Sequence, residues 1–190
     1  MKNEENQRIR LTKRLLREAL LRLLEESTIQ KISVTQLCEE AGINRATFYR
    51  HYGSPADVLQ EMEFEMIDGL QAAIGEDASG GSLSFQRQAS LVCDYLWKHS
   101  QEAKLFFGNT GVGSDFAEKL FRYIEGQSVS ERYGGDSLNA YQKELIGAFW
   151  QSGFFSMIRQ WLVEEIPLSP EAVADLMLLV AMRGLNVEQH

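Results

Sequence analysis

The spacing of apolar residues constrains the fold of this chain more than any other feature. Leucines and alanines recur every three or four positions between residues 9 and 27, and the same spacing returns in most later segments. This period places one apolar stripe along an α-helix. Sustained alternation of apolar and polar residues, which is typical of half-buried strands, is not found. We therefore predict an all-α protein of about nine helices.

Two short helices joined by a tight turn are predicted after the first helix. Ser33 is a suitable N-cap for a helix that ends at Gly42, a residue that adopts the left-handed conformation easily. Asn44 can cap the next helix, which we expect to continue to Tyr52. Gly53, Ser54 and Pro55 follow, with Ser54 and Pro55 suited to begin a further helix. This arrangement is a helix-turn-helix pattern.

A polar, glycine-rich segment at 75–82 suggests a division of the chain. We expect an N-terminal helix-turn-helix domain over residues 1–54, a connecting helix over 55–75, and a C-terminal helical domain over 76–190. The C-terminal domain is expected to serve regulation and dimerisation.

The residue inventory argues against several classes of protein. Cys38 and Cys93 are the only cysteines and make no disulfide framework. The N-terminus has no apolar signal region, and no apolar run approaches the roughly 20 residues that a membrane span requires. With only three histidines and no metal-ligand spacing, we expect no metal, no cofactor and no enzyme. The expected location is the cytoplasm.

The charge is unevenly distributed along the chain. The whole chain has a net charge of −8, which by itself argues against a polyanionic partner. Residues 1–60, however, hold 10 Lys and Arg against 8 Asp and Glu, a net +2, whereas residues 61–190 hold 9 against 19, a net −10. The acidic average therefore conceals a basic N-terminal part that is suited to nucleic acid.

The segment Ile32–Tyr52 resembles the DNA-binding domain of the tetracycline-repressor (TetR/AcrR) family of bacterial transcription regulators. The resemblance depends on Ser33 and Thr35, on the turn Ala41-Gly42-Ile43, and on Thr47-Phe48-Tyr49-x-His51-Tyr52. It extends over about residues 8–70 and implies a DNA-binding regulator, with repression as the usual mode. The family commonly has a lysine, close to a phosphate, where this chain has Pro55, so one expected contact is missing.

The same residues are suited to DNA on physical grounds. A helix fits the major groove, and its exposed residues reach base edges while flanking groups bind phosphate. Arg45 and Arg50 are candidate guanine readers, because a guanidinium can bond O6 and N7 together. Hydroxyl and amide groups at a helix N-terminus can bind phosphate. The predicted DNA-binding residues are Ser33, Thr35, Asn44, Arg45, Ala46, Thr47, Tyr49, Arg50, His51 and Arg14.

Some of these residues have structural alternatives. Tyr49 could pack against the first helix, and Phe48 and Leu37 are expected in the core. The basic face of the first helix could be a solvated surface or a phosphate-binding surface. Its members are Arg10, Lys13, Arg14 and Arg17.

The last two helices, around 149–162 and 173–185, have apolar residues on more than one face. Burial on two faces requires two partners, and in a small chain the second is often another subunit. We expect a homodimer through these helices rather than a purely internal core. Aromatic residues of the C-terminal domain could line a pocket for a small apolar or aromatic effector, or form core or interface. The candidates are Tyr95, His99, Phe107, Phe121, Trp150 and Phe154.

These observations favour a homodimeric transcription regulator that binds a pseudo-palindromic double-stranded DNA operator and responds to a ligand. A regulator controlled by a protein partner, or one that activates, remains an alternative. An all-α enzyme is a more distant one, because no catalytic motif is found.

Overall fold

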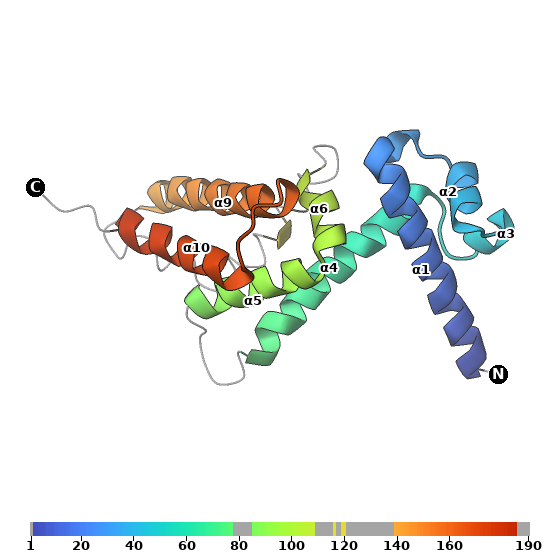
Figure 1. The fold of residues 1–190 in the computed structure, drawn as a ribbon, viewed down its shortest axis with the longest axis horizontal. Coiled ribbons are helices and arrows are strands. Elements are labelled where there is room, and N and C mark those ends of the chain that lie inside the picture. The colour runs from blue at the N-terminus through green and yellow to red at the C-terminus, as the bar shows by residue number, and fades with distance from the viewer. Residues whose placement is uncertain (1, 78–84, 109–115, 117–118, 121–138, 186–190) are drawn as a thin grey trace, which may run out of the picture. The chain divides into compact units, whose positions relative to one another are not determined.

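The computed structural model describes residues 2–77, 85–108, 116, 119–120 and 139–185. Eight α-helices and one 3-10 turn make up the regular structure of these residues, and none of them forms a strand. The predicted all-α class is confirmed, with eight helices in the described part of the chain against the nine expected. Figure 1 shows the ribbon.

The chain divides into two compact units, Met1–Met66 and Ile67–His190. The division falls inside α4 (Pro55–Asp77), the helix that the sequence assigns to the connection. Each unit is described by itself below.

The first unit contains α1 (Lys2–Glu26), the 3-10 turn η1 (Ile29–Lys31), α2 (Val34–Ala41), α3 (Arg45–Phe48) and the beginning of α4. The helix predicted over 9–27 begins at Lys2 instead. Residues 5–8 of this added segment are exposed, so no apolar period marks them in the sequence.

The core of the first unit forms where α1 meets the short helices. The predicted apolar stripe of α1 is confirmed, since Leu16, Ala19, Leu20 and Leu24 are buried and Leu23 is half-buried. Burying a leucine or phenylalanine side chain contributes about 1.5–3 kcal/mol, so this contact holds the unit together. The buried residues are Leu16, Ala19, Leu20, Leu24, Ile32, Leu37, Cys38, Phe48, Tyr52, Val58, Leu59, Met62 and Met66.

The second unit is built from α5 (Phe85–Lys98), α6 (Ser100–Gly108), α9 (Ala140–Val163) and α10 (Pro170–Leu185), together with the end of α4. Helix α10 packs along α5, and α6 packs against α9 (Figure 1). Ala89, Val92 and Leu96, spaced three or four residues apart on α5, are buried.

Trp161 fixes the connection between α9 and α10. Its indole ring is 2% exposed and stacks on Trp97 of α5 with 5.3 Å between ring centroids. The Nε1–H group donates to the carbonyl of Leu168 at 2.9 Å, which ties the loop to the end of α9. Helix α10 then begins at Pro170, with Ser169 accepting a hydrogen bond from the amide of Ala172 at 3.2 Å. The polar end of the indole is thus satisfied where the chain turns.

Both C-terminal helices have apolar residues on a buried and on an exposed side. Trp150, Ile158 and Leu162 of α9 are buried. Tyr141, Leu145 and Phe149, spaced four residues apart on the same helix, are 70–78% exposed. On α10, Leu176, Leu179 and Val180 are exposed as well. We call these six residues the outer apolar face.

A glycine inside α4 allows the side chain of Tyr95 to approach closely. A Cβ atom at Gly69 would lie 2.6 Å from Cζ of Tyr95. We predict that Gly69→Ala stabilises a Tyr95→Ala variant by about 1 kcal/mol through helix propensity. With Tyr95 present, this gain should vanish or reverse. Urea unfolding of the two single variants and the double variant measures the coupling, and strict additivity would contradict the close packing.

Candidate nucleic-acid interface

Helix α2 begins and ends at the residues that the sequence indicates. The Oγ atom of Ser33 accepts a hydrogen bond from the amide of Gln36 at 3.2 Å, and the amide of Ser33 donates to Oε1 of Gln36 at 2.9 Å. This reciprocal capping box fixes the first turn. Gly42 ends the helix with φ of +65°, and the amide of Ile43 donates to Cys38 at 2.9 Å. The turn between α2 and α3 is therefore defined by its own backbone.

Helix α3 is shorter than the sequence predicts. Asn44 caps it by accepting a hydrogen bond from the amide of Ala46 at 2.8 Å. The α-helix covers only Arg45–Phe48. The next residues tighten, since the amides of Arg50 and His51 donate to carbonyls three positions earlier. The predicted helix to Tyr52 is wrong in extent, since the α-helix ends at Phe48.

The predicted DNA-contacting side chains of this segment are mostly on its exposed side. Arg45, Ala46, Tyr49 and Arg50 are exposed, whereas Phe48 is fully buried. Tyr49 is 53% exposed and only touches Phe48 edge-on, so it is available to a partner outside the core. The expected core positions of Phe48 and Leu37 are confirmed. Thr47 and His51 are half-buried, and Ser33, Thr35 and Asn44 are exposed.

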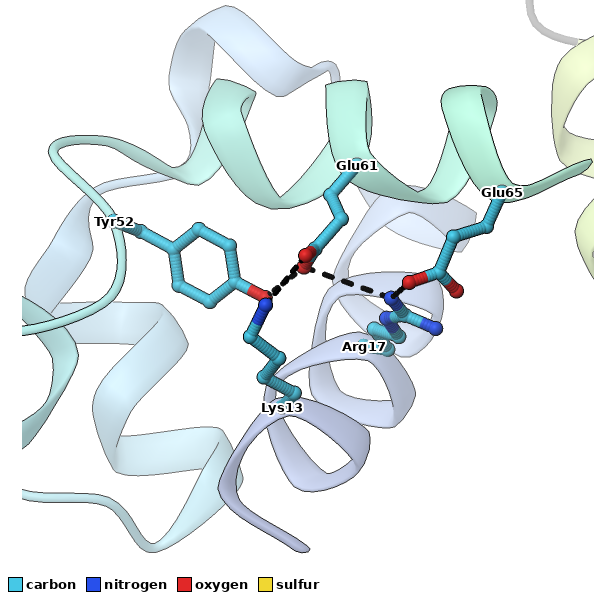
Figure 2. Close-up of polar contacts among 5 residues, drawn as sticks. All are labelled: Lys13, Arg17, Tyr52, Glu61 and Glu65. Carbon is cyan, nitrogen blue, oxygen red and sulfur yellow. Dashed lines mark hydrogen bonds and ion pairs between the residues drawn. The ribbon is translucent and has the colours of Figure 1, made fainter. Parts of the chain in front are cut away.

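Two of the four cations on the basic face of α1, Lys13 and Arg17, form ion pairs with α4, an outcome that neither alternative considered from the sequence includes. Lys13 Nζ lies 2.5 Å from Oε1 of Glu61, and Arg17 bonds Glu65 and lies 3.5 Å from Glu61. The hydroxyl group of Tyr52 donates to the other oxygen of Glu61. Figure 2 shows these five side chains between α1 and α4. We call them the α1–α4 network.

Two further cations of α1 have acidic partners. Arg22 lies 2.6 Å from Glu40 of α2. Arg14, which the sequence predicts to contact DNA, lies 3.7 Å from Glu18 one turn along α1, and both side chains are more than half exposed. Such exposed pairs contribute little, so Arg14 can exchange Glu18 for a phosphate at little cost.

Sequence reasoning missed Glu61 and Glu65. The signal was present in the spacing: Lys13 and Arg17 are four residues apart, and so are Glu61 and Glu65. Two helices that each present one such pair, of opposite charge, can bond across their contact. The sequence does not show which helices touch, so only the fold reveals the match.

The α1–α4 network alters the pKa values of Glu61, Tyr52 and Arg17. Burial alone raises the pKa of Glu61, but the hydrogen bonds from Lys13 and Tyr52 and the charges of Lys13 and Arg17 outweigh it and lower this pKa. Burial, and then the bond to Glu61, raise the pKa of Tyr52. The bond to Glu65 raises the pKa of Arg17. At neutral pH Glu61 and Arg17 are therefore ionised, and Tyr52 is neutral.

The start of α4 is closed by its own residues. Asp57 accepts hydrogen bonds from the amides of Gly53 at 2.7 Å and Ser54 at 3.2 Å, and from the hydroxyl group of Ser54 at 2.8 Å. Pro55 is buried at the first helical position. These bonds, led by that from the Ser54 hydroxyl group, lower the pKa of Asp57.

The predicted pocket residues lie in three groups in the described part of the chain. Trp150 stacks with Phe154 at 5.4 Å between centroids, and Phe107 stacks with Phe155 at 4.9 Å. Tyr95 stacks with His99 at 4.4 Å, and His99 is exposed. Phe121 lies outside the described residues. An effector pocket stays a prediction.

A capped helix-turn-helix with exposed basic and polar side chains on its second helix defines a DNA-binding module of the kind found in transcription regulators. Residues 16–62 match the family model of bacterial regulatory proteins, tetR family. Over this segment, the chain is similar to that family.

The chain is also similar to a curated relative, the uncharacterized HTH-type transcriptional regulator YxbF of Bacillus subtilis (strain 168). The two are 24% identical over 161 residues, which are 84% of this chain and 42% of the relative. The chain thus spans less than half of the length of that relative.

Solved structures share the fold at low sequence identity. A TetR transcriptional regulator from Streptococcus agalactiae 2603V matches with a TM-score of 0.68 and 18% identity, over 95% of this chain and 99% of the other. Thermus thermophilus FadR, a TetR-family transcriptional repressor in complex with lauroyl-CoA, matches with a TM-score of 0.60 and 14% identity. That match covers 94% of this chain and 97% of the repressor.

The cap at the start of α4 yields a prediction of pH dependence. Asp57→Ala should lower the free energy of unfolding by about 1 kcal/mol at pH 7, because two backbone amides lose their acceptor. Since the folded pKa of Asp57 is below its ordinary value of about 3.9, this contribution is present above that pH and decreases as pH falls through the folded pKa. Urea unfolding at neutral and acid pH measures the difference.

Asp68→Ala is the matched control, because Asp68 is exposed on the same helix. It makes the same change of side chain without removing a cap. Equal losses in both variants, or a loss that does not shrink in acid, would contradict the role of Asp57.

Proposed function

We propose that this chain is a sequence-specific DNA-binding transcription regulator. The observation that supports it best is the division of side chains on α3, where Phe48 is buried while Arg45, Ala46, Tyr49 and Arg50 are exposed. Such a segment presents donors and an aromatic hydroxyl group to the major groove while its own core contact holds it in place.

The exposed residues can be assigned different tasks. Arg45 follows the cap Asn44 and stands at the N-terminal end of α3, the end that enters the groove in helix-turn-helix proteins. We assign base reading to Arg45 and Arg50, and phosphate contact to Tyr49 and His51. Ser33 and Thr35 at the start of α2 supply hydroxyl and amide donors to phosphate.

We further propose that the regulator is a homodimer. The support is the outer apolar face, because monomeric proteins seldom expose large contiguous apolar patches. A two-fold contact through α9 and α10 would bury this face against its own copy and provide two DNA-binding modules. Two modules would bind a pseudo-palindromic operator with half-sites about one helical turn apart.

The mode of regulation that we propose is repression released by a small apolar or aromatic effector. The aromatic groups around Trp150 and Phe107 in the second unit supply apolar surface for such a ligand. The FadR repressor of Thermus thermophilus, whose structure contains lauroyl-CoA, shares this fold. An effector would act by favouring a dimer whose modules no longer fit successive grooves.

The proposed place of action is the bacterial cytoplasm, where the operator would be found. No helix of the described residues is long and apolar enough to cross a membrane.

The proposal predicts a base-specific role for Arg45. After the preferred sequence has been obtained by selection from random duplexes, Arg45→Ala should weaken binding to it by about 1–3 kcal/mol and relax the preference at one position. The measurement is a second selection with the variant, together with equilibrium binding at fixed salt. Arg22→Ala removes the same charge from a residue paired with Glu40 and should leave the base preference unchanged. An unaltered preference in Arg45→Ala would remove its assigned role.

The outer apolar face predicts the oligomeric state. Phe149 belongs to the α9 part of the outer apolar face, which is more exposed than the α10 part. Phe149→Glu places a charge there and should convert a dimer into monomers, as measured by sedimentation velocity or light scattering. Phe64→Glu is the matched control, because Phe64 is similarly exposed but lies in the first unit. A wild-type monomer, or a dimer in Phe149→Glu, would contradict the proposed interface.

A further inference from the structure

The cations of α1 fall into two sets. Arg8 and Arg10 near its N-terminus are exposed and form no ion pair with other described residues. Lys13 and Arg17, one turn apart, are both paired with carboxylates of α4, and their side chains are only 33% and 21% exposed. The two cations and two carboxylates of the α1–α4 network sum to zero net charge. The carboxylates of α4 therefore neutralise this part of the basic helix α1.

The neutral part lies beside the segment to which we assign DNA contact. Lys13 Nζ is 5.6 Å from the ring centroid of Tyr52, which directly follows His51 in the chain. The hydroxyl group of Tyr52 shares the carboxylate of Glu61 with Lys13 (Figure 2). A lysine has a flexible four-carbon stem, so without Glu61 its ammonium group could turn toward a phosphate of bound DNA.

We propose that Glu61 and Glu65 keep Lys13 and Arg17 from binding DNA phosphate and so limit sequence-independent affinity. The inference rests on the proposed function, because it concerns DNA bound by the same module. It assigns to α4 an electrostatic task that neither the family match nor the contact residues of α3 imply.

The physical argument concerns counterions. Affinity for DNA of any sequence increases with the number of phosphates that Lys and Arg neutralise, and each such contact adds about 0.9 to the slope of log affinity against log salt. Base contacts contribute only at the right sequence. A regulator that withholds two cations therefore loses affinity for all sequences equally and leaves discrimination to Arg45 and Arg50.

The ion pairs of the α1–α4 network are suited to keeping Lys13 and Arg17 away from DNA phosphates at neutral pH. Glu61 binds Lys13 through one oxygen and Tyr52 through the other, which fixes the carboxylate on both sides. Arg17 has two carboxylate partners, so removal of either one leaves a second. The pair Arg14–Glu18 differs, since it is longer, exposed and confined to one helix.

The test measures binding of the full chain to a duplex of random sequence as a function of salt. Glu61→Gln should release mainly Lys13 and steepen the slope by about one unit, or about tenfold in affinity per tenfold change in salt. Glu61→Gln/Glu65→Gln should release both cations and steepen it by about two units. Adding Lys13→Met to Glu61→Gln should return the slope to the wild-type value, which a purely structural role of Glu61 would not predict.

Glu25→Gln is the control for charge alone, because Glu25 is exposed on α1 and the change removes one negative charge without releasing a cation. It should leave the slope within about half a unit of wild type. Glu65→Gln tests the proposal if Glu61→Gln unfolds, since Glu65 is half exposed. With Arg17 still near Glu61, we expect Glu65→Gln to steepen the slope by less than one unit.

The possible results separate the two proposals. If the wild-type chain binds no duplex, the proposed function fails. If it binds DNA but folded Glu61→Gln and the double glutamine variant keep its slope, the role of the carboxylates is refuted. A slope that rises equally in Glu25→Gln, or that Lys13→Met does not restore, refutes it as well.

Discussion

The burial of Phe48 is the contact on which the DNA-binding module depends. Helix α3 has only four residues, too few to be stable through its own hydrogen bonds. Its direction is therefore set by what lies on either side: the Asn44 cap before it, the Tyr52 hydroxyl group bound to Glu61 after it, and the fully buried ring of Phe48 between them. Arg45 and Arg50 can face outward because this ring faces inward.

The cations of the module are divided in a similar way: some form ion pairs within the protein, and others are exposed to a partner. The sequence shows a basic α1 and leaves open whether that charge faces solvent or phosphate. In the structure Lys13, Arg17 and Arg22 are bonded to carboxylates of α4 and α2. These pairs join α1 to two other helices, so part of the positive charge stabilises the module. The cations that remain available to a partner are fewer than the sequence count. They include the exposed arginines near the beginning of α1 and those in and directly after α3.

The sequence predicted those features that depend on neighbouring residues. The cap at Ser33, the left-handed Gly42 and the cap at Asn44 are each determined within a few positions, and each is found. The buried stripe of α1 was predictable for the same reason, since its period is local. The early start of α1 at Lys2 was not, because exposed polar residues have no period to detect.

Features that depend on which helices meet could not be predicted in this way. The approach of Glu61 to Lys13 requires α4 to lie against α1, a contact between residues 48 positions apart. The candidate pocket residues have the same difficulty: aromatic residues grouped from the sequence as one candidate pocket pack into separate stacks, Trp150 with Phe154 and Phe107 with Phe155. Composition identifies the rings but does not determine which rings touch.

The outer apolar face has an energetic consequence for the second unit. Leu145 and Phe149 on α9, together with Leu176 on α10, leave apolar area in water that would stabilise the fold if it were covered, at roughly 25 cal/mol per Å². A chain that dimerises through this face would derive part of its stability from the second copy, and its unfolding would then depend on protein concentration. Any ligand that changed the packing of α9 and α10 would act on dimer stability and on the spacing of the DNA-binding modules through the same contacts. In the proposed regulator, a single equilibrium in the packing of α9 and α10 would therefore govern both dimer assembly and DNA recognition.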